Sequence, residues 1–316
     1  MYPLTPGVLE NENHAKKICP QKANINIMSL NVNGFTSPAN NMNGIEKWPS
    51  IYQMMKGNKI AILALQETHL NNELLHAINV CFRKRNQILN SQLPIDPCTS
   101  ARVAFVINQS LISPMNLESI DLIQGQVAAL KFNWHEEEIL LINIYAPNNK
   151  QDNTQFWEDL DEKRRAKRLR QPDFLLGDFN VTEDPIDRAP AHLDDINTIA
   201  ALRNMHQTLG LKDEWRHTYP NKRCFMYRAN HNGQQVKSRI DRIYCLNKVA
   251  KSTFDWKIRQ TSVPMDHWMV AAKYAPKEAL YIGKGQWTWQ LTEIKNKELM
   301  EKIKKKKKGG WNCNMI

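Results

Sequence analysis

Short apolar runs alternate along this chain with amphipathic segments, and several of the runs end in polar residues. The clearest is the run 174–176, which Gly177 ends and which Asp178 and Asn180 follow. Side chains two residues apart on a strand point to the same face, so these two polar groups can share one edge of a sheet. Taken alone, this tetrad is an ordinary turn in which both side chains satisfy local backbone groups. Four other segments end in the same manner and favour a functional edge, at Asn31, Glu67, Tyr145 and Asp266-His267.

The same patterns predict strands alternating with helices. Strands are expected where apolar and β-branched residues alternate or run together, and helices where amphipathic segments follow capping residues. The expected strands are 25–30, 60–65, 102–108, 121–132 and 139–145, with a hairpin of 224–228 and 238–245 around the polar loop 229–235. The expected helices are 49–56, 71–85 and 156–170. This alternation predicts an α/β fold.

The two ends of the chain differ in composition from its centre. Residues 1–23 carry three prolines among polar residues and are expected to form a flexible leader. Residues 24–275 are expected to form the folded domain, and 276–316 a linker remnant with a lysine-rich disordered tail. A nuclear address or a tether to DNA is the alternative interpretation of the lysine run.

Composition limits the class of protein. With 316 residues and 42% hydrophobic content, the chain can bury a substantial core. The net charge of +11 suggests a polyanionic partner, but Lys302 and Lys304 to Lys308 supply six of these charges, which leaves about +5 for the rest. The six cysteines include no Cys-x-x-Cys pair, which argues against a zinc site and a disulfide framework. No apolar run reaches membrane-spanning length, and we expect a soluble, unsecreted protein of the nucleus or cytoplasm.

Each polar residue at a strand end has a structural and a functional interpretation. Glu67 follows a fully apolar strand, where a carboxylate is costly to bury unless a cation such as a hard divalent metal compensates it. Capping the next helix is the alternative, although Asn71 or Asn72 serves that purpose better. Asn31 either completes a turn or faces a phosphate or a metal-bound water. Tyr145 is left at a sheet edge because Pro147 cannot continue the strand, which is also compatible with an ordinary half-buried tyrosine.

Six short motifs carry a resemblance to a known family. In chain order they are Asn31-Val32-Asn33-Gly34, Gln66-Glu67-Thr68-His69, Tyr145-Ala146-Pro147-Asn148, Gly177-Asp178-Phe179-Asn180, Ser238-Arg239-Ile240-Asp241 and Asp266-His267. Together they resemble the endonuclease/exonuclease/phosphatase superfamily. In detail the chain is similar to the apurinic-type endonuclease domain of a LINE-type non-LTR retrotransposon, from about Asn24 to Tyr274.

The resemblance implies a DNase I-like fold, a four-layered α/β sandwich in which two mixed β-sheets are flanked by helices. It also implies a Mg²⁺-dependent phosphodiesterase site, in which Mn²⁺ is expected to substitute. Glu67 would be the principal metal ligand, with Asn31 and Asp266 close to the metal. Among the catalytic residues, Asp178 would be the base for the attacking water and Asn180 would orient that water. Asp241 would hold His267 against the scissile phosphate, and the Tyr145 hydroxyl would donate a hydrogen bond to a phosphate oxygen.

DNA contacts are expected at a second set of residues. In such endonucleases the hairpin after the central motif enters a DNA groove, where groove width and step flexibility contribute to target choice. A glycine-containing exposed hairpin explains the same composition without any DNA contact. The candidate DNA-binding residues are Arg188, Asn230, His231, Asn232 and Gln234.

The predicted function is a DNA-nicking endonuclease that generates a 3′-hydroxyl for target-primed reverse transcription. Element RNA and the reverse transcriptase would be partners in the full-length element. Two residues depart from the family pattern: Met226 stands where relatives often have threonine, and Met265 where the family usually has serine. These departures suggest a copy of the enzyme with reduced activity. The alternatives are therefore a catalytically weak or silent nucleic-acid-binding relic, and an abasic-site repair endonuclease.

Overall fold

The computed structural model describes residues 21–34, 47–91, 103–231, 233–261 and 265–282. Contacts divide the chain into two compact units, of which the larger is Asn24–Ala279. In the smaller unit, β1 (Gln21–Lys22) pairs antiparallel with β17 (Tyr281–Ile282). Within the described ranges, no helix is long and apolar enough to cross a membrane.

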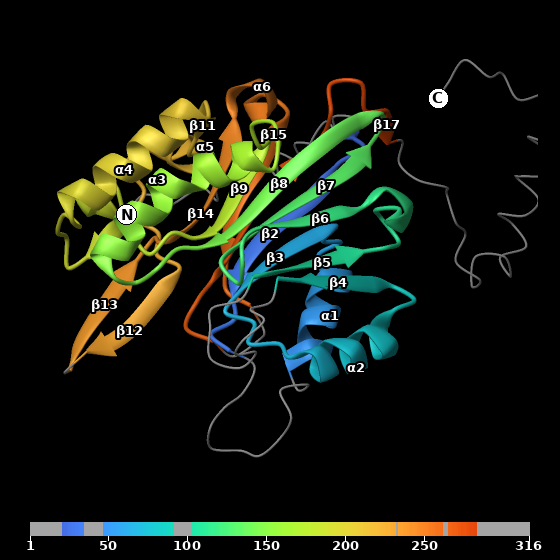
Figure 1. The fold of residues 1–316 in the computed structure, drawn as a ribbon, viewed down its shortest axis with the longest axis horizontal. Helices are drawn as coiled ribbons and strands as arrows, with labels where there is room; N and C mark the ends of the chain where they lie inside the picture. The colour runs from blue at the N-terminus through green and yellow to red at the C-terminus, as the bar shows by residue number, and fades with distance from the viewer. Residues whose placement is uncertain (1–20, 35–46, 92–102, 232, 262–264, 283–316) are drawn as a thin grey trace, which may run out of the picture. The chain divides into compact units, whose positions relative to one another are not determined.

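The described strands of the larger unit form two six-stranded mixed sheets (Figure 1). The first sheet has a parallel pair at its centre, β2 with β3, and antiparallel pairs elsewhere. Its order is β15 (Thr253–Arg259), β16 (Met269–Tyr274), β2 (Ile25–Asn31), β3 (Ile62–Gln66), β5 (Ala104–Asn108) and β4 (Asn86–Asn90).

The second sheet repeats this plan, with β8 and β9 as its parallel pair. Its order is β11 (Leu211–Lys212), β14 (Asp241–Leu246), β9 (Phe174–Asp178), β8 (Glu137–Tyr145), β7 (Val127–Trp134) and β6 (Glu118–Ile123). Two mixed sheets with flanking helices confirm the predicted fold class.

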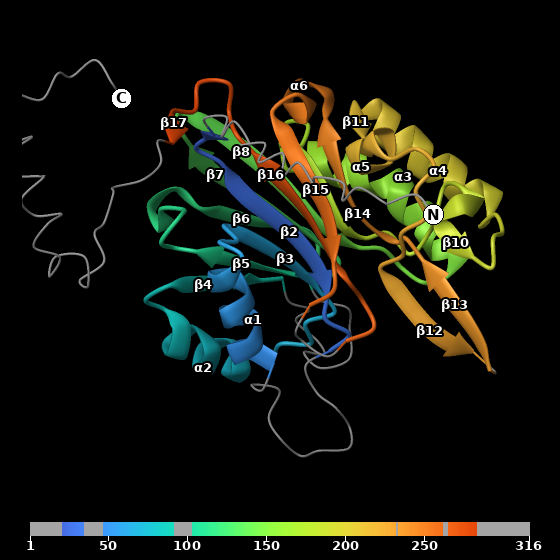
Figure 2. The same cartoon turned by 180° about the vertical axis from the view of Figure 1, so that it is seen from behind.

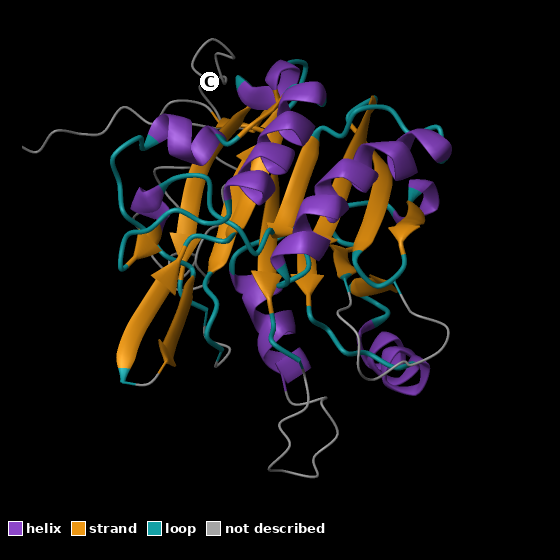
Figure 3. Cartoon of the chain, turned by 60° about the vertical axis from the view of Figure 1, so that its left-hand side comes forward, coloured by secondary structure: helices purple, strands orange, loops and turns teal. Residues whose placement is uncertain are grey.

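Helices cover the outer faces of the sheets, as Figure 3 shows for one side. The helices α1 (Lys47–Gly57) and α2 (Asn72–Phe82) share a hydrophobic core with the first sheet. The helices α3 (Lys150–Ala166) and α4 (Ile196–Thr208) share another with the second sheet. A third core lies between the sheets, which completes the order helices, sheet, sheet, helices. Shorter helical turns are α5 (Glu214–Thr218), α6 (Asn247–Ala250), η1 (Pro114–Asn116) and η2 (Pro185–Asp187).

Strand alternation divides β2 between two of these cores. Ile25 and Ile27 enter the core between the sheets, while Met28 and Leu30 enter the core beneath α1. This is the period of two that a strand imposes on its side chains. Burying both faces leaves little room for charged side chains, and β2 and β3 contain none.

Polar side chains replace apolar ones toward one end of the layer between the sheets. Ser29, Gln66 and Asn143 are each fully buried there. The Gln66 amide donates to Asn143 Oδ1 at 2.7 Å and to Ser29 Oγ at 3.1 Å, and Asn143 Nδ2 donates to the carbonyls of Leu65 and Ala104, both at 3.0 Å. Because these bonds satisfy the buried groups, the network joins the two sheets without leaving an unpaired amide.

A third, smaller sheet contains a hairpin that projects away from both large sheets (Figures 1 and 2). Its order is β10 (Arg188–Ala189), β13 (Gln234–Ser238) and β12 (Tyr227–His231). A hairpin was predicted here, but most of its expected second strand, 238–245, belongs to β14 of the second large sheet, and residues expected in the loop form the hairpin strands. The register pairs His231 with Gln234, which places these polar residues in the ladder.

Among the other differences from prediction, two have a clear structural cause. The segment 121–132 is two strands, because Gly125 adopts a positive φ of 71° in the turn between β6 and β7. Helix α3 begins at Lys150, six residues before the predicted start, because the Asn149 side chain accepts hydrogen bonds from the backbone N–H groups of Gln151 and Asp152. A side-chain cap of this kind starts a helix before its amphipathic pattern becomes visible.

Candidate active site

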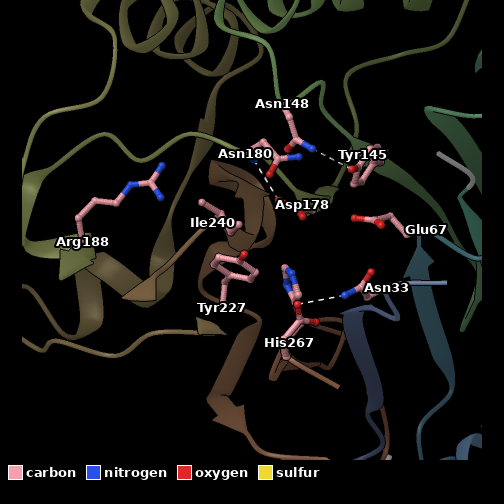
Figure 4. A pocket seen from close by; sticks show the side chains of 11 residues that line it. Asn33, Glu67, Tyr145, Asn148, Asp178, Asn180, Arg188, Tyr227, Ile240 and His267 are labelled. Carbon is pink, nitrogen blue, oxygen red and sulfur yellow. Dashed lines mark hydrogen bonds between the residues drawn. The ribbon is translucent and has the colours of Figure 1, made fainter. Parts of the chain in front are cut away.

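Four strand ends from both large sheets meet at one rim. Strands β2, β3, β8 and β9 all end there, and β14 begins there with Asp241. In the second sheet, Tyr145, Asp178 and Asp241 are successive cross-strand partners. The rim encloses a cavity of about 450 Å³ (Figure 4), lined by Asn33, Glu67, Tyr145, Asn148, Asp178, Asn180, Arg188, Tyr227, Ile240, Asp266 and His267.

Gly177 allows β9 to deliver Asp178 to this rim. A Cβ at position 177 would lie 2.0 Å from the carbonyl oxygen of Ile144 on β8, and the residue has a φ of +141°. Both facts exclude any residue with a side chain. Close contact between β8 and β9 therefore depends on this glycine, which the sequence pattern could identify only as a strand end.

Asn31 connects the two principal carboxylates. Its Nδ2 donates to Glu67 Oε1 at 2.8 Å and to Asp178 Oδ2 at 2.9 Å, while its Oδ1 accepts from the backbone N–H of Asn33. The structure thus brings Asn31 beside the predicted ligand Glu67, but with its amide nitrogen toward the carboxylates. Its oxygen is already engaged by the turn, so in this arrangement Asn31 orients Glu67.

Glu67 occupies the left-handed region of backbone conformation, with a φ of 51°. Asn33 and Asn180, also at the rim, have φ of 45° and 52°. Asparagine tolerates this region, whereas a glutamate there carries conformational strain. Backbone strain of this kind costs about 1–3 kcal/mol and is tolerated where a side chain must point at a functional site.

We expect the free energy of unfolding of Glu67→Gly to be about 1 kcal/mol larger than that of Glu67→Ala, so that the glycine variant is the more stable one. Both substitutions remove the carboxylate, but only glycine relieves the positive φ. Chemical denaturation of the two variants in EDTA measures the difference. Equal stability of the two variants, or a more stable alanine variant, would contradict a strained backbone at this position.

Asp178 is fully buried with both oxygens engaged. Oδ2 accepts from Asn31 and Oδ1 accepts from the backbone N–H of Asn180 at 3.0 Å. Burial, and next the negative charge of Asp241, raise the pKa of Asp178 from 3.8 to about 7. A carboxylate with this pKa is suited to accept a proton near neutral pH.

His267 and Asp241 form a buried pair. Nδ1 of the imidazole lies 2.8 Å from Asp241 Oδ2, and the two side chains are 5% and 0% exposed. Burial lowers the pKa of His267, but the charge of Asp241 and its hydrogen bond outweigh this effect and raise the pKa to about 9. The imidazole is therefore cationic at neutral pH and can stabilise a phosphate oxygen.

Neutral donors complete the cavity. Burial, followed by the charges of Glu67 and Asp178, raises the pKa of the Tyr145 hydroxyl well above its usual range, so it remains protonated. Asn148 Nδ2 donates to that hydroxyl at 3.4 Å. Asn180 Nδ2 donates to the Ala146 carbonyl at 2.7 Å, which holds its side chain at the mouth of the cavity. Donors without charge can contact an anion without adding to the acidic character of the site.

The carboxylates fit a hard divalent cation. Glu67 and Asp266 line the same cavity, and Asp266 Oδ1 is a buried oxygen with no hydrogen-bond partner among the described residues. Asn33 Nδ2 holds the other oxygen of Asp266 at 3.1 Å. Asp178, Asp241 and His267 also place ligand atoms within 4.8 Å of one another, but hydrogen bonds engage both oxygens of Asp178, Asp241 Oδ2 and His267 Nδ1. Oxygen donors and an excess of negative charge are what Mg²⁺ and Mn²⁺ prefer.

The predicted DNA-binding residues are dispersed. Arg188 lines the cavity, and its guanidinium is paired with Asp194 at 2.7 Å. Asn230 and Gln234 are exposed on the projecting hairpin, away from the cavity lining. The backbone of His231 belongs to β12, and Asn232 lies outside the described residues.

Sequence reasoning missed several lining residues. Asn33 and Asn148 stood within quoted motifs but were assigned no role, although each contacts a site residue. Tyr227 carried no signal, because its place in the cavity depends on cross-strand pairing. The neighbouring Met226 is buried in the core between the sheets, which directs its side chain away from the cavity. Met265 packs against the core beneath α1.

Fold and cavity together define a class of phosphate-cleaving enzymes. The profile of the Endonuclease/Exonuclease/phosphatase family matches residues 28–253, and the chain belongs to this family, which confirms the family resemblance. Membership of this family identifies the chain as an enzyme of the endonuclease, exonuclease or phosphatase type.

Three relatives illustrate the similarity. The Transposon TX1 uncharacterized 149 kDa protein of Xenopus laevis is 27% identical over 221 residues, which are 70% of this chain and 16% of that protein. The endonuclease domain of TRAS1, a telomere-specific non-LTR retrotransposon, superposes with a TM-score of 0.57 at 16% identity, over 80% of this chain and all of that one. The AP endonuclease LMAP from Leishmania major gives 0.64 at 16% identity, over 80% and 88% of the two chains. At these identities the solved structures show a shared fold.

Proposed function

We propose that this chain is a Mg²⁺-dependent endonuclease that nicks one DNA strand by hydrolysis and leaves a 3′-hydroxyl. Such an end primes reverse transcription in a non-LTR retrotransposon, and element RNA and a reverse transcriptase are its proposed partners there. The observation that carries the proposal is the rim cavity, where Glu67, Asp178 and Asp266 meet a histidine paired with a buried aspartate. The similarity to a transposon protein and to the TRAS1 endonuclease domain supports the biological context.

The residues divide the work of hydrolysis between charge and proton transfer. Glu67 and Asp266, with Asn31 beside them, would hold Mg²⁺ or Mn²⁺, whose charge offsets that of the phosphate when it is bound. Asp178 accepts the proton of the attacking water, which Asn180 orients toward phosphorus. His267, held protonated by Asp241, faces a non-bridging oxygen, and the Tyr145 hydroxyl donates to the phosphate as a neutral group.

The proposed DNA contacts extend from the cavity to the hairpin. Arg188 would contact a phosphate next to the scissile one, because it lines the same cavity. Asn230, His231, Asn232 and Gln234 would approach a groove from the hairpin, whose strands project beyond both large sheets (Figure 1). Phosphate contacts fix position, whereas contacts in the groove carry sequence preference.

The first alternative is an abasic-site repair enzyme, because AP endonucleases share this fold. Two substrates separate it from the proposed function. Purified protein is incubated with supercoiled plasmid and with a duplex that carries one abasic analogue, and the nicks are then extended with a DNA polymerase. We expect nicking of undamaged plasmid and extension from the nick. Cleavage confined to the abasic duplex would favour repair, and nicks that cannot be extended would contradict the 3′-hydroxyl.

A catalytically silent relic that only binds nucleic acid is the second alternative. Met226, Met265 and the lysine-rich tail suggest this alternative, but the Met226 side chain is 0% exposed in the core and does not border the cavity. At the rim, both oxygens of Asp178 accept hydrogen bonds, and His267 Nδ1 is paired with Asp241 Oδ2. These contacts favour an active enzyme over a relic.

The pH dependence of nicking should report the Asp241 and His267 pair. Because the pKa of His267 is raised to about 9, the imidazole of the parent protein stays protonated up to that pH. Asp241→Asn removes the main raising charge while burial still lowers the pKa, so the alkaline loss of activity should move from about pH 9 toward neutrality. Single-turnover rates between pH 6 and pH 10 measure this shift. An unchanged alkaline limb would exclude this pair as its origin.

A further inference from the structure

One row of cross-strand partners runs through the small sheet to the catalytic histidine. Arg188 is the partner of Ser238, Ser238 is the partner of Tyr227, and Tyr227 forms an isolated antiparallel bridge with His267. We call these four residues the hairpin row. Partners on neighbouring strands present their side chains on the same face of a sheet. Three of the four, Arg188, Tyr227 and His267, line the rim cavity.

Backbone hydrogen bonds on both sides of the bridge fasten the histidine segment to β12. Trp268 N–H donates to the Met226 carbonyl at 2.9 Å, and Arg228 N–H donates to the Asp266 carbonyl at 3.2 Å. The Arg228 guanidinium also lies 4.1 Å from the centre of the Trp268 ring. The segment that carries Asp266 and His267 is thus an added edge of the hairpin sheet, in the part of the chain that the structure describes.

The side chains across this bridge are in contact. The Tyr227 ring lies 5.0 Å from the His267 ring, centre to centre, at an angle of 50° between their planes (Figure 4). Tyr227 is half-buried, and burial followed by the charges of Asp266, Asp178 and Glu67 raises its pKa. The two rings pack against each other in the lining of the cavity.

A second constraint on the imidazole has a clear physical purpose. The covalent bond to Cβ and the hydrogen bond from Nδ1 to Asp241 restrict the imidazole, but a small rotation about the Cβ–Cγ bond still tilts the ring. An aromatic ring packed against the imidazole limits this rotation and keeps the opposite nitrogen directed at one point. Groups that orient a catalytic or metal-binding histidine typically change activity by about 10- to 100-fold when they are removed.

We propose that Tyr227 is a positioning residue, whose ring holds the His267 imidazole in its working orientation and couples it to the hairpin. This inference rests on the proposed function of the rim cavity. The contact that matters is the ring, so the phenol oxygen is dispensable. A tyrosine that instead donated its hydroxyl to the phosphate would depend on that oxygen.

Three variants separate these roles. Tyr227→Phe keeps the ring without the hydroxyl, Tyr227→Leu removes the ring, and Tyr52→Leu removes an aromatic residue from a stacked pair with Phe82 outside the cavity as a matched control. Steady-state nicking with Mg²⁺ should give near-parental kcat for Tyr227→Phe and for the control. Tyr227→Leu should lower kcat by about 10- to 100-fold with little change in KM. Equal losses of kcat in Tyr227→Phe and Tyr227→Leu, or an effect confined to KM, would overturn the proposal.

A spectroscopic measurement keeps the inference testable apart from activity. The His267 imidazole resonances are assigned in ¹H–¹⁵N spectra of the metal-free protein by comparison with His267→Gln. We expect Tyr227→Leu to move and broaden these resonances, while Tyr227→Phe and Tyr52→Leu leave them close to the parent. If the parent protein does not nick DNA, the proposed function fails while these spectra still decide the ring contact. Unchanged imidazole resonances in Tyr227→Leu would overturn the positioning role whatever the activity.

Discussion

Asp178→Asn is expected to reduce DNA nicking by about 10²- to 10⁴-fold, because it removes the proposed proton acceptor while keeping the shape of the side chain. Asparagine has a single acceptor oxygen, so it keeps one of the two hydrogen bonds that Asp178 accepts, from Asn31 or from the Asn180 backbone. The loss should therefore appear in the rate of cleavage, with DNA binding retained. Rates of plasmid nicking and gel-shift affinities for parent and variant measure the two effects. Cleavage within tenfold of the parent would exclude Asp178 as the base.

The same substitution should stabilise the metal-free protein at alkaline pH. The pKa of Asp178 is raised from 3.8 to about 7 by burial and then by Asp241, so the folded state disfavours the ionised form. Folded protein holds a proton that unfolded protein has lost between these values, and stability accordingly falls as pH rises through this window. We expect Asp178→Asn to gain roughly 1–2 kcal/mol at pH 8 and less at pH 5. Glu158→Gln, at an exposed position of α3, is the matched control.

Glu67→Gln is expected to remove both the response to metal and the cleavage. Saturating Mg²⁺ at about 100 times its Kd should raise the unfolding free energy of the parent by about 2.7 kcal/mol, since only the folded site binds it. The variant lacks the carboxylate that lines the cavity and should show little of this shift. Nicking should fall on the order of a thousandfold, because metal stabilisation of the transition state is worth several kcal/mol.

Thermal unfolding of parent, Glu67→Gln and Glu158→Gln, each with Mg²⁺ and with EDTA, measures the metal response directly. The exposed control should keep the full shift. A parent-like shift in Glu67→Gln would show that the cation is held elsewhere. In that case Asp178, Asp241 and His267, whose ligand atoms lie within 4.8 Å of one another, would be the next positions to test.

The buried strands and the rim residues could be predicted because they are local features. An apolar run ended by Gly177 and followed by Asp178 shows in the sequence that a polar group leaves a buried strand. The need for glycine is visible only in three dimensions, since it arises from the Ile144 carbonyl on the neighbouring strand. The family resemblance implied the layer order, and the three hydrophobic cores confirm it.

What could not be predicted depends on pairing between distant segments. Tyr227 reaches the cavity through its bridge to His267, forty residues later in the chain, and no local period encodes that contact. The orientation of the Asn31 amide is likewise set by Glu67 and Asp178 together. The buried link between Gln66 and Asn143 joins both sheets behind the rim, although each residue alone reads as an interruption of an apolar strand. Such contacts determine geometry at the site while leaving the strand pattern almost unchanged.

The measurement that tests the central claim most directly is conversion of supercoiled plasmid to open circles by the parent protein, with Mg²⁺ and with EDTA, beside Glu67→Gln. An active phosphodiesterase site at the rim predicts open circles only for the parent and only with Mg²⁺. Absence of nicking by folded parent protein in Mg²⁺ or Mn²⁺, or equal nicking by Glu67→Gln, would contradict the assignment of this cavity as the site of DNA cleavage.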